Sequence, residues 1–275
     1  MIVARTLPEL DAAVATLRAG GRRLALVPTM GALHAGHKAL VDAAVASGAA
    51  TATSIFVNPL QFAATEDLSR YPRTEDADLA LLRAAGNHLV WMPDVATMYP
   101  PGDVSLVDVA GPPAERWEAD HRPGHFRGMA TVVTKLFGQV RPDAAYFGEK
   151  DWQQLQVVRR FVADLHLRLD IVGIETVREA DGLALSSRNR FLTPAERPVA
   201  ALINRVMRGI AYARDVQAAL VPGRQRLTDS GFAVDYLALV DGPTLMPLDD
   251  AAPQARIIAA ARLGSVRLID NIAAG

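Results

Sequence analysis

The chain has 275 residues but no cysteine, little aromatic content (6%) and no marked charge excess, with a formal net charge of −1. Without cysteine it can form no disulfide and use no thiol chemistry, which fits a cytoplasmic protein. Mixed charges of both signs predict neither a nucleic-acid partner nor a polyanion-binding surface. The N-terminus does not have the pattern of a signal peptide, and the alanine-rich stretches are too short and too charged to span a membrane.

Lysine is also scarce. Only Lys38, Lys135 and Lys150 are found among 29 basic residues, and the rest are arginines. A chain that uses arginine almost everywhere keeps lysine where a compact ammonium is needed. Lys150 is therefore a candidate for phosphate binding, whereas Lys38 reads more simply as a solvated surface charge.

Apolar runs alternate with helical patterns along the first two thirds of the chain. Repeated βα units of this kind predict a Rossmann-like parallel sheet covered by helices, over residues 1–176. Residues 177–275 read as a smaller α+β domain that acts as a lid, with helices at 196–213 and 216–220 followed by three strand-like runs. The strands of the first domain are expected at 24–27, 51–57, 89–92, 144–147 and 170–174.

The most informative segment follows the strand at 24–27. It reads Pro-Thr-Met-Gly-Ala-Leu-His-Ala-Gly-His and ends at His37. A strand, a tight turn and a helix start in this order predict an anion site, because the first N–H groups of a helix lack partners and carry the positive end of its dipole. His34 and His37 can donate hydrogen bonds to phosphate there, and the glycines allow close approach.

Metal binding is the alternative for these two histidines. The zinc-protease motif spaces its histidines four apart around a glutamate, which is absent here, and the chain has no cysteine to complete a zinc site.

Further polar segments follow later strands, and ligands of parallel sheets bind at the carboxyl ends of strands. Asn58–Phe62 carries amides that suit hydroxyls or carboxylates, or is an ordinary Asn-Pro turn. Gly148–Gln154 suits a phosphate, or is a solvated helix start. Asp181–Asn189 offers hydroxyls and an arginine as a phosphate clamp, or simply a helix cap. Arg122–Gly128 is either a gating loop or a connector.

Taken together, these segments strongly resemble the pantothenate synthetase (pantoate–β-alanine ligase) family, within the nucleotidylyltransferase group that has a His-x-Gly-His motif. The resemblance includes Arg70-Tyr71-Pro72-Arg73 and covers nearly the whole chain, in the order and spacing of the family. It implies ATP-dependent joining of (R)-pantoate to β-alanine through a pantoyl adenylate, with release of pyrophosphate and AMP. It also implies Mg²⁺ with the ATP, a homodimer, and no membrane or nucleic-acid partner.

The resemblance assigns roles residue by residue. His37, matched to the family's proton donor, is expected to be catalytic with His34 and Lys150. Gln61 and Gln154 would hold pantoate, and Gln61 would also touch β-alanine. Ala35 stands where many members have an acidic residue, with little effect expected. The ATP-binding residues it implies are Met30, Gly31, Ala32, Leu33, His34, Ala35, Gly36, His37, Gly148, Glu149, Lys150, Asp151, Val177, Leu185, Ser186, Ser187 and Arg188.

Two other functions compete with this one. A nucleotidylyltransferase that acts on a phosphorylated acceptor would need extra basic residues, which these segments lack. A non-catalytic nucleotide-binding module is disfavoured by the intact set of His34, His37, Lys150 and Arg188.

Overall fold

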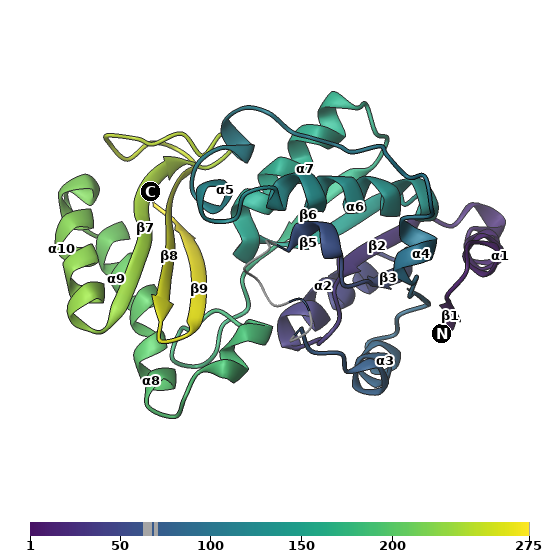
Figure 1. The fold of residues 1–275 in the computed structure, drawn as a ribbon, viewed down its shortest axis with the longest axis horizontal. Coiled ribbons are helices and arrows are strands. Elements are labelled where there is room, and N and C mark those ends of the chain that lie inside the picture. Colours follow the sequence, from purple (N-terminus) through teal and green to yellow (C-terminus); the bar gives the residue numbers. More distant parts are fainter. Residues whose placement is uncertain (63–67, 69–70, 275) are drawn as a thin grey trace. The chain divides into compact units, whose positions relative to one another are not determined.

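The computed structural model describes residues 1–62, 68 and 71–274. The chain divides into two compact units, each of which is built from more than one segment (Figure 1). The first unit contains Met1–Ala110, Arg122–Glu149 and Val157–Ile174. The second contains Gly111–His121, Lys150–Gln156 and residues 175–274.

The first unit is built on a sheet of six parallel strands, which confirms the predicted Rossmann-like fold. Leu24–Val27 in the centre are fully buried, as expected for a strand covered on both faces. In spatial order the sheet runs β1-β4-β3-β2-β5-β6. The strand bounds are β1 Ile2–Ala4, β2 Leu24–Thr29, β3 Ala50–Ile55, β4 Leu89–Trp91, β5 Ala144–Gly148 and β6 Asp170–Ile174.

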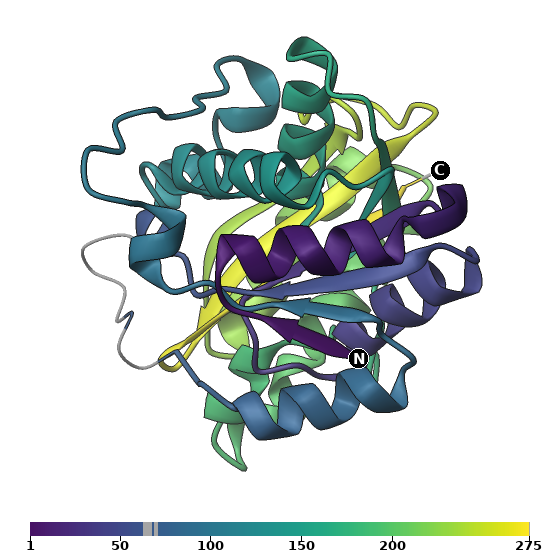
Figure 2. The same ribbon diagram turned by 90° about the vertical axis from the view of Figure 1, so that its right-hand side faces the viewer.

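Helices cover both faces of this sheet. Figure 2 shows α1 (Leu7–Leu17) and α6 (His125–Val140) across one face, and Phe137 of α6 contacts Phe161 of α7 (Trp152–Asp164) with ring centroids 6.2 Å apart. The other face is covered by α2 (Ala35–Ala46) and α3 (Glu75–Ala84), whose apolar residues pack on Ala25, Val27 and Val90. Burial of these apolar stripes is the main driving force for this packing.

The strand order reverses at β2. From β2 the chain crosses to β3 on one side, while β5 pairs with β2 on the other. Ligands of open parallel sheets bind at such a switch point, beyond the carboxyl ends of the strands. The segment between β2 and α2, which carries the two histidines, leaves the sheet at this point.

The second unit has an antiparallel sheet of three strands in the order β7-β8-β9. Their bounds are β7 Phe232–Asp241, β8 Ala255–Leu263 and β9 Val266–Ala273. Side chains alternate between the faces, so Ile257 packs into the cluster formed with α9 (Leu202–Ala211), and Ile258 into a cluster with Trp117 and Trp152.

A buried charge cluster ties Gly111–His121 into this unit. Arg267 donates two hydrogen bonds to Glu118, at 2.8 and 2.6 Å, and a third to Asp235 at 2.7 Å. The Tyr236 hydroxyl also donates to Glu118, at 2.8 Å. Because one partner left alone would be an uncompensated buried charge, the cluster holds this segment firmly.

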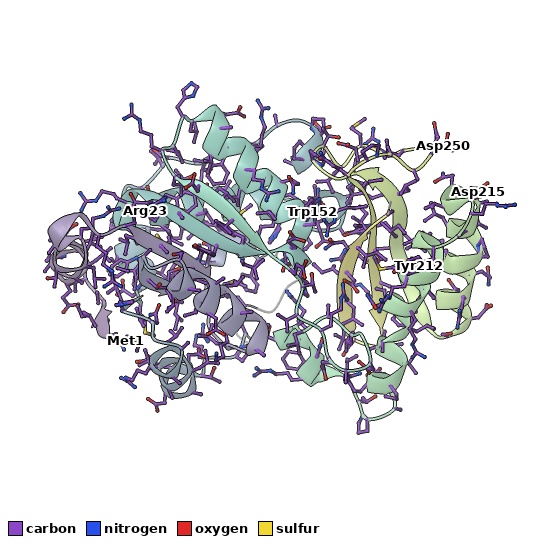
Figure 3. All side chains as sticks on the ribbon, turned by 180° about the vertical axis from the view of Figure 1, so that it is seen from behind. Met1, Arg23, Trp152, Tyr212, Asp215 and Asp250 are labelled. Atoms are coloured by element: carbon purple, nitrogen blue, oxygen red, sulfur yellow. The ribbon has the colours of Figure 1, made fainter. Side chains whose placement is uncertain are left out.

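Several elements differ from the sequence prediction. The helix expected at 196–213 is two helices, α8 (Glu196–Ala200) and α9, which meet at Ala201. The helix expected to end at 220 continues as α10 (Val216–Asp229), past Pro222. The turn between α9 and α10 carries Tyr212, which is exposed, and Asp215, which caps α10 by accepting from the Ala218 N–H (Figure 3). The short edge strand β1 was not predicted.

The remaining short elements are α4 Val95–Met98, α5 Glu118–His121 and the 3₁₀ turns η1 Ala19–Gly21, η2 Pro59–Gln61, η4 Pro112–Ala114, η5 Glu149–Asp151 and η6 Ser187–Phe191.

Candidate active site

The turn between β2 and α2 has an unusual backbone. Gly31 and Ala32 both have positive φ, at 83° and 51°. A buried carboxylate from α3 stabilises it, because Asp78 accepts hydrogen bonds from the N–H groups of Ala32 at 2.9 Å and Leu33 at 2.8 Å. The Thr74 hydroxyl donates to the same carboxylate at 3.1 Å. The Ala32 and Leu33 N–H groups are therefore already engaged within the protein.

The two histidines cap the helix that follows. His34 is the N-cap of α2, and its Nδ1 accepts from the Gly36 N–H at 3.1 Å. The His37 Nδ1 accepts from the His34 N–H at 3.4 Å, and the ring centroids lie 4.2 Å apart. A neutral imidazole that accepts at Nδ1 carries its proton on Nε2. Both rings are thus set to donate from Nε2, at the positive end of a helix dipole.

Gln61 lies in η2, beyond the end of β3, and only 8% of it is exposed. Asn58 donates to Gln61 Oε1 at 3.0 Å and to the Gly128 carbonyl at 3.1 Å, while Tyr99 donates to Asn58 Oδ1 at 2.7 Å. Burial and the nearby charge of Asp103 raise the pKa of the Tyr99 hydroxyl, so it keeps its proton for this bond. The Gln61 side-chain oxygen is thus occupied, and the Gln61 Nε2 donates to the Met30 sulfur at 3.1 Å.

The backbone of Gln61 is fixed by the start of α6. His125 Nδ1 lies 2.9 Å from the Gln61 carbonyl and must donate to it, since a carbonyl can only accept. A Cβ at Gly128 would lie 2.1 Å from the Leu60 carbonyl oxygen, so only glycine allows this approach. Arg122–Gly128 therefore supports Gln61, a role that neither of the two sequence interpretations included.

In the second unit, Lys150 lies in η5, directly after β5. Its side chain is 18% exposed, and Nζ lies 3.8 Å from an Asp151 carboxylate oxygen. The neighbouring glutamines differ: Gln153 is buried, with its amide nitrogen 3.2 Å from three carbonyls of residues 113–116. Gln154 is half-buried.

Also in the second unit, residues 177–185 form a tight hairpin. Leu185 N–H donates to the Val177 carbonyl at 3.0 Å, and Glu179 N–H to the Leu183 carbonyl at 2.8 Å. Arg197 bonds Asp181 at 2.7 Å and so lowers the pKa of that carboxyl. The hairpin leads into Ser186, whose hydroxyl accepts from the Arg188 N–H at 3.2 Å. The cap interpretation of this segment is correct for Ser186, and Arg188 is exposed.

The structure offers no protein-only metal centre in residues 1–62, 68 and 71–274, where no three His, Cys, Asp or Glu side chains are grouped to hold an ion. Over the same residues, no helix combines the length and apolar character needed to cross a bilayer.

A family model described as pantoate-beta-alanine ligase matches residues 2–273 of this chain. The chain belongs to the pantoate–β-alanine ligase family. It is 58% identical to the pantothenate synthetase of Acidiphilium cryptum over 99% of this chain and 100% of that protein. It is 56% identical to the one from Rhizorhabdus wittichii, over 99% of this chain and 98% of the relative.

Solved structures of pantoate–β-alanine ligases have the same fold. The pantothenate synthetase from Thermus thermophilus superposes with a TM-score of 0.94 at 46% identity, covering 100% of this chain and 99% of that one. The ligase from Francisella tularensis, described as complexed with beta-gamma ATP and beta-alanine, gives a TM-score of 0.86 at 32% identity, with 99% and 97% covered.

Within the first unit, the structure brings Met30 and Gln61 together, and it pairs His34 with His37. Arg70, which contributes to the family resemblance, lies outside the described residues. Sequence reasoning missed the supporting roles of Asp78, Tyr99 and His125. It named Asn58, but not as a residue that orients Gln61. Asp78 is the fourth residue of α3. Its burial sets it apart from the other acidic residues of that turn, but burial is visible only in the fold.

Replacing Asp78 by Asn tests whether its carboxylate holds the β2–α2 turn in the conformation that the enzyme needs for activity. The amide keeps one acceptor but turns an NH₂ group toward the second N–H, which leaves that donor unpaired. We expect Asp78→Asn to lower pantoate-dependent exchange of pyrophosphate into ATP about tenfold, through misplaced histidines. Asp76→Asn removes the same charge from an exposed position of the same helix turn and should change the rate little. Equal rates in the two variants would contradict the role of Asp78.

Proposed function

We propose that this chain condenses (R)-pantoate with β-alanine to pantothenate, a coenzyme A precursor, in two steps. A pantoate carboxylate oxygen first attacks the α-phosphorus of ATP, and pyrophosphate leaves as the pantoyl adenylate forms. The β-alanine amine then attacks the acyl carbon, loses a proton, and AMP leaves with the amide formed. A free carboxylate is a poor electrophile, so the first step supplies the leaving group that the second requires.

The observation that carries this proposal is the histidine pair at the start of α2. Attack at the α-phosphorus builds negative charge on the bridging and pyrophosphate oxygens, and fixed donors stabilise that charge. His34 and His37 are both held to donate from Nε2, by bonds at their Nδ1 atoms. No protein nucleophile is required by either step.

The other roles follow from the family. Gln61 and Gln154 bind pantoate, and Gln61 also contacts β-alanine. The support for Gln61 is its oriented amide, which offers N–H donors that suit a carboxylate or hydroxyl. Lys150 acts on the phosphates as a compact cation. ATP is bound by Met30, Gly31, Ala32, Leu33, His34, Ala35, Gly36, His37, Gly148, Glu149, Lys150, Asp151, Val177, Leu185, Ser186, Ser187 and Arg188.

Mg²⁺ belongs to the proposal as the ion that enters with ATP. It prefers hard oxygen ligands and keeps several waters, and it commonly binds through substrate phosphates. Binding through ATP phosphates requires no cluster of three protein ligands, and residues 1–62, 68 and 71–274 contain none. The ion neutralises phosphate charge when bound.

Three further features are proposed from the resemblance: a homodimer, a cytoplasmic location, and a lid role for residues 177–275. The lid would protect the adenylate, which water would otherwise hydrolyse.

Isotope exchange tests the reaction. Labelled pyrophosphate should enter ATP only when pantoate is present, and addition of β-alanine should yield AMP and the amide. Exchange that needs a phosphorylated acceptor instead would indicate another nucleotidylyltransferase. Nucleotide binding without AMP formation, with all three substrates present, would indicate a binding module.

Alanine substitutions of Gln61 and Gln154 should affect the two half-reactions differently. Gln154→Ala should weaken pantoate use and pantoate-dependent exchange together, by roughly tenfold or more, because lost amide bonds leave substrate groups unpaired. ATP affinity by calorimetry should stay nearly unchanged. Gln61→Ala should do the same and also slow capture of the adenylate by β-alanine in single turnover. A Gln154 variant that loses ATP binding but keeps pantoate affinity would contradict this assignment.

A further inference from the structure

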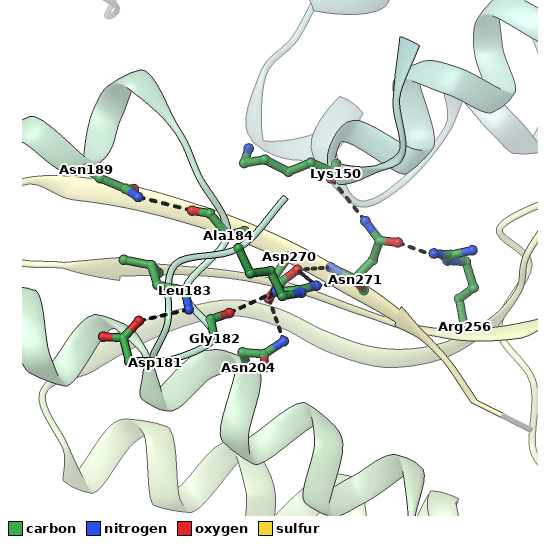
Figure 4. Close-up of polar contacts among 11 residues, drawn as sticks. Lys150, Asp181, Gly182, Leu183, Ala184, Asn189, Asn204, Arg256, Asp270 and Asn271 are labelled. Carbon is green, nitrogen blue, oxygen red and sulfur yellow. Dashed lines mark hydrogen bonds and ion pairs between the residues drawn. The ribbon is translucent and has the colours of Figure 1, made fainter. Parts of the chain in front are cut away.

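Two adjacent polar residues near the end of β9, Asp270 and Asn271, are 2% and 3% exposed. Buried polar groups are costly unless they are hydrogen-bonded, so such a pair within an apolar strand needs an explanation. Successive side chains of a strand point to opposite faces, so these two can reach different segments. Figure 4 shows their polar contacts, all of which lie within the second unit.

Asp270 is bonded to the hairpin at 177–185. Arg178 donates to both of its carboxylate oxygens, at 2.7 and 2.9 Å, and Asn204 donates at 3.2 Å. The same guanidinium donates to the Gly182 carbonyl at 3.1 Å, at the tip of the hairpin. Gly182 is pressed against Asn204, since a Cβ there would lie 2.9 Å from the Asn204 side-chain oxygen. One buried carboxylate, acting through Arg178, therefore helps to hold the hairpin in position.

Asn271 is bonded to the segment that carries Lys150. Its Nδ2 donates to the Lys150 carbonyl at 3.0 Å, and its Oδ1 accepts from Arg256 Nε at 2.9 Å. Both partners allow only this amide orientation, because a carbonyl only accepts and a guanidinium only donates. Figure 4 shows the Lys150 side chain extending away from Asn271, so the contact fixes the backbone and does not involve the ammonium.

We propose that Asp270 and Asn271 are positioning residues for adenylate formation: Asn271 fixes the main chain that presents Lys150, and Asp270, through Arg178, fixes the hairpin that leads to Arg188. Neither residue is assigned a contact with substrate. The inference rests on the proposed function, in which Lys150 and Arg188 bind the phosphates. A displacement of about 1 Å in a side chain that binds phosphate can reduce the rate by up to roughly 10²-fold. Residues that prevent such a displacement therefore affect the rate without contacting substrate.

Asn271→Ala should raise the KM for ATP and lower pantoate-dependent exchange about tenfold or more. Asn271→Asp is the second variant: it keeps the acceptor for Arg256 but loses the donor to Lys150, and should show a loss at least as large. Leu268→Ala, at a buried apolar position of the same strand, is the matched control. It should lower the melting temperature and leave KM and kcat unchanged below that temperature. If all three variants lose activity in proportion to their melting temperatures, the positioning role is wrong.

A double-mutant cycle tests the mechanism of the effect. If Asn271 acts through Lys150, Asn271→Ala should have little further effect on exchange in a Lys150→Ala background, whereas a merely structural role gives independent, multiplying losses. Asp270→Asn should likewise lose its effect in an Arg188→Ala background. Multiplying losses in both cycles would overturn the inference. If Lys150→Ala and Arg188→Ala each retain near wild-type exchange, it is the proposed function of these two residues that fails.

Discussion

His37→Ala should reduce pantoate-dependent pyrophosphate exchange on the order of 10²-fold or more, the usual loss when one transition-state donor is removed. The variant should still fold, because the bond that His37 makes to the His34 N–H is long, at 3.4 Å, and its side chain is only half-buried. ATP binding should weaken far less than the rate, since the charge that His37 meets develops during the reaction.

Two comparisons sharpen this result. His166→Asn changes an exposed histidine with a φ of 52°, a conformation that asparagine tolerates, and should leave exchange unchanged. His34→Ala removes the N-cap of α2 as well as a phosphate donor, so it should lose activity and also about 1 kcal/mol of stability. Near wild-type exchange by His37→Ala would exclude the proposed proton donor.

Lys150→Arg should cause a loss of similar size, although it preserves the charge. A guanidinium is planar and broad, so it cannot replace a compact ammonium in a tight phosphate site. The side chain is 18% exposed, and its backbone is held by Asn271, which leaves little room to adapt. Exchange kinetics should show a lower kcat together with a higher KM for ATP.

Lys38→Arg is the matched control. Lys38 forms an exposed ion pair with Asp42 one turn along α2, at 2.7 Å, and arginine can make the same pair. Such pairs are worth only a few tenths of a kcal/mol. If Lys38→Arg and Lys150→Arg are equally harmless, scarcity of lysine carries no information about this site.

The sheet and the histidine segment could be predicted because their signals are local. Apolar runs, glycine turns and helix starts lie within a few residues of one another, and the family resemblance adds an order of motifs. Asp78 could not be found in this way. It is one of 30 acidic residues, and its partners Ala32 and Leu33 come more than forty positions earlier.

Helix α10 shows how tertiary packing overrides a local signal. Pro222 and Gly223 normally end a helix, and the sequence prediction stopped before them. In the structure Gly223 lies against α9, where a Cβ would meet Ile210 at 2.7 Å and Val206 at 3.2 Å. The glycine permits close helix contact, and the apolar surface buried there keeps the helix continuous.

Gln153 and Gln154 show a different limit. They are chemically identical neighbours, and no local pattern separates them. In the structure the amide of Gln153 donates to the carbonyls of residues 113–116, whereas Gln154 is half-buried and its pantoate role remains a proposal.

The segmented make-up of the second unit has a consequence for dissecting this enzyme. A fragment of residues 177–275 would lack Glu118, the buried partner of Arg267, and Trp152, whose indole donates to the Gly242 carbonyl at 2.7 Å. Severing the chain once, by protease or by gene truncation, would place these groups on the other fragment, and Arg267 would keep its bond to Asp235 but lose both bonds to Glu118. Exchanging this unit between relatives therefore requires moving residues 111–121 and 150–156 together with residues 175–274.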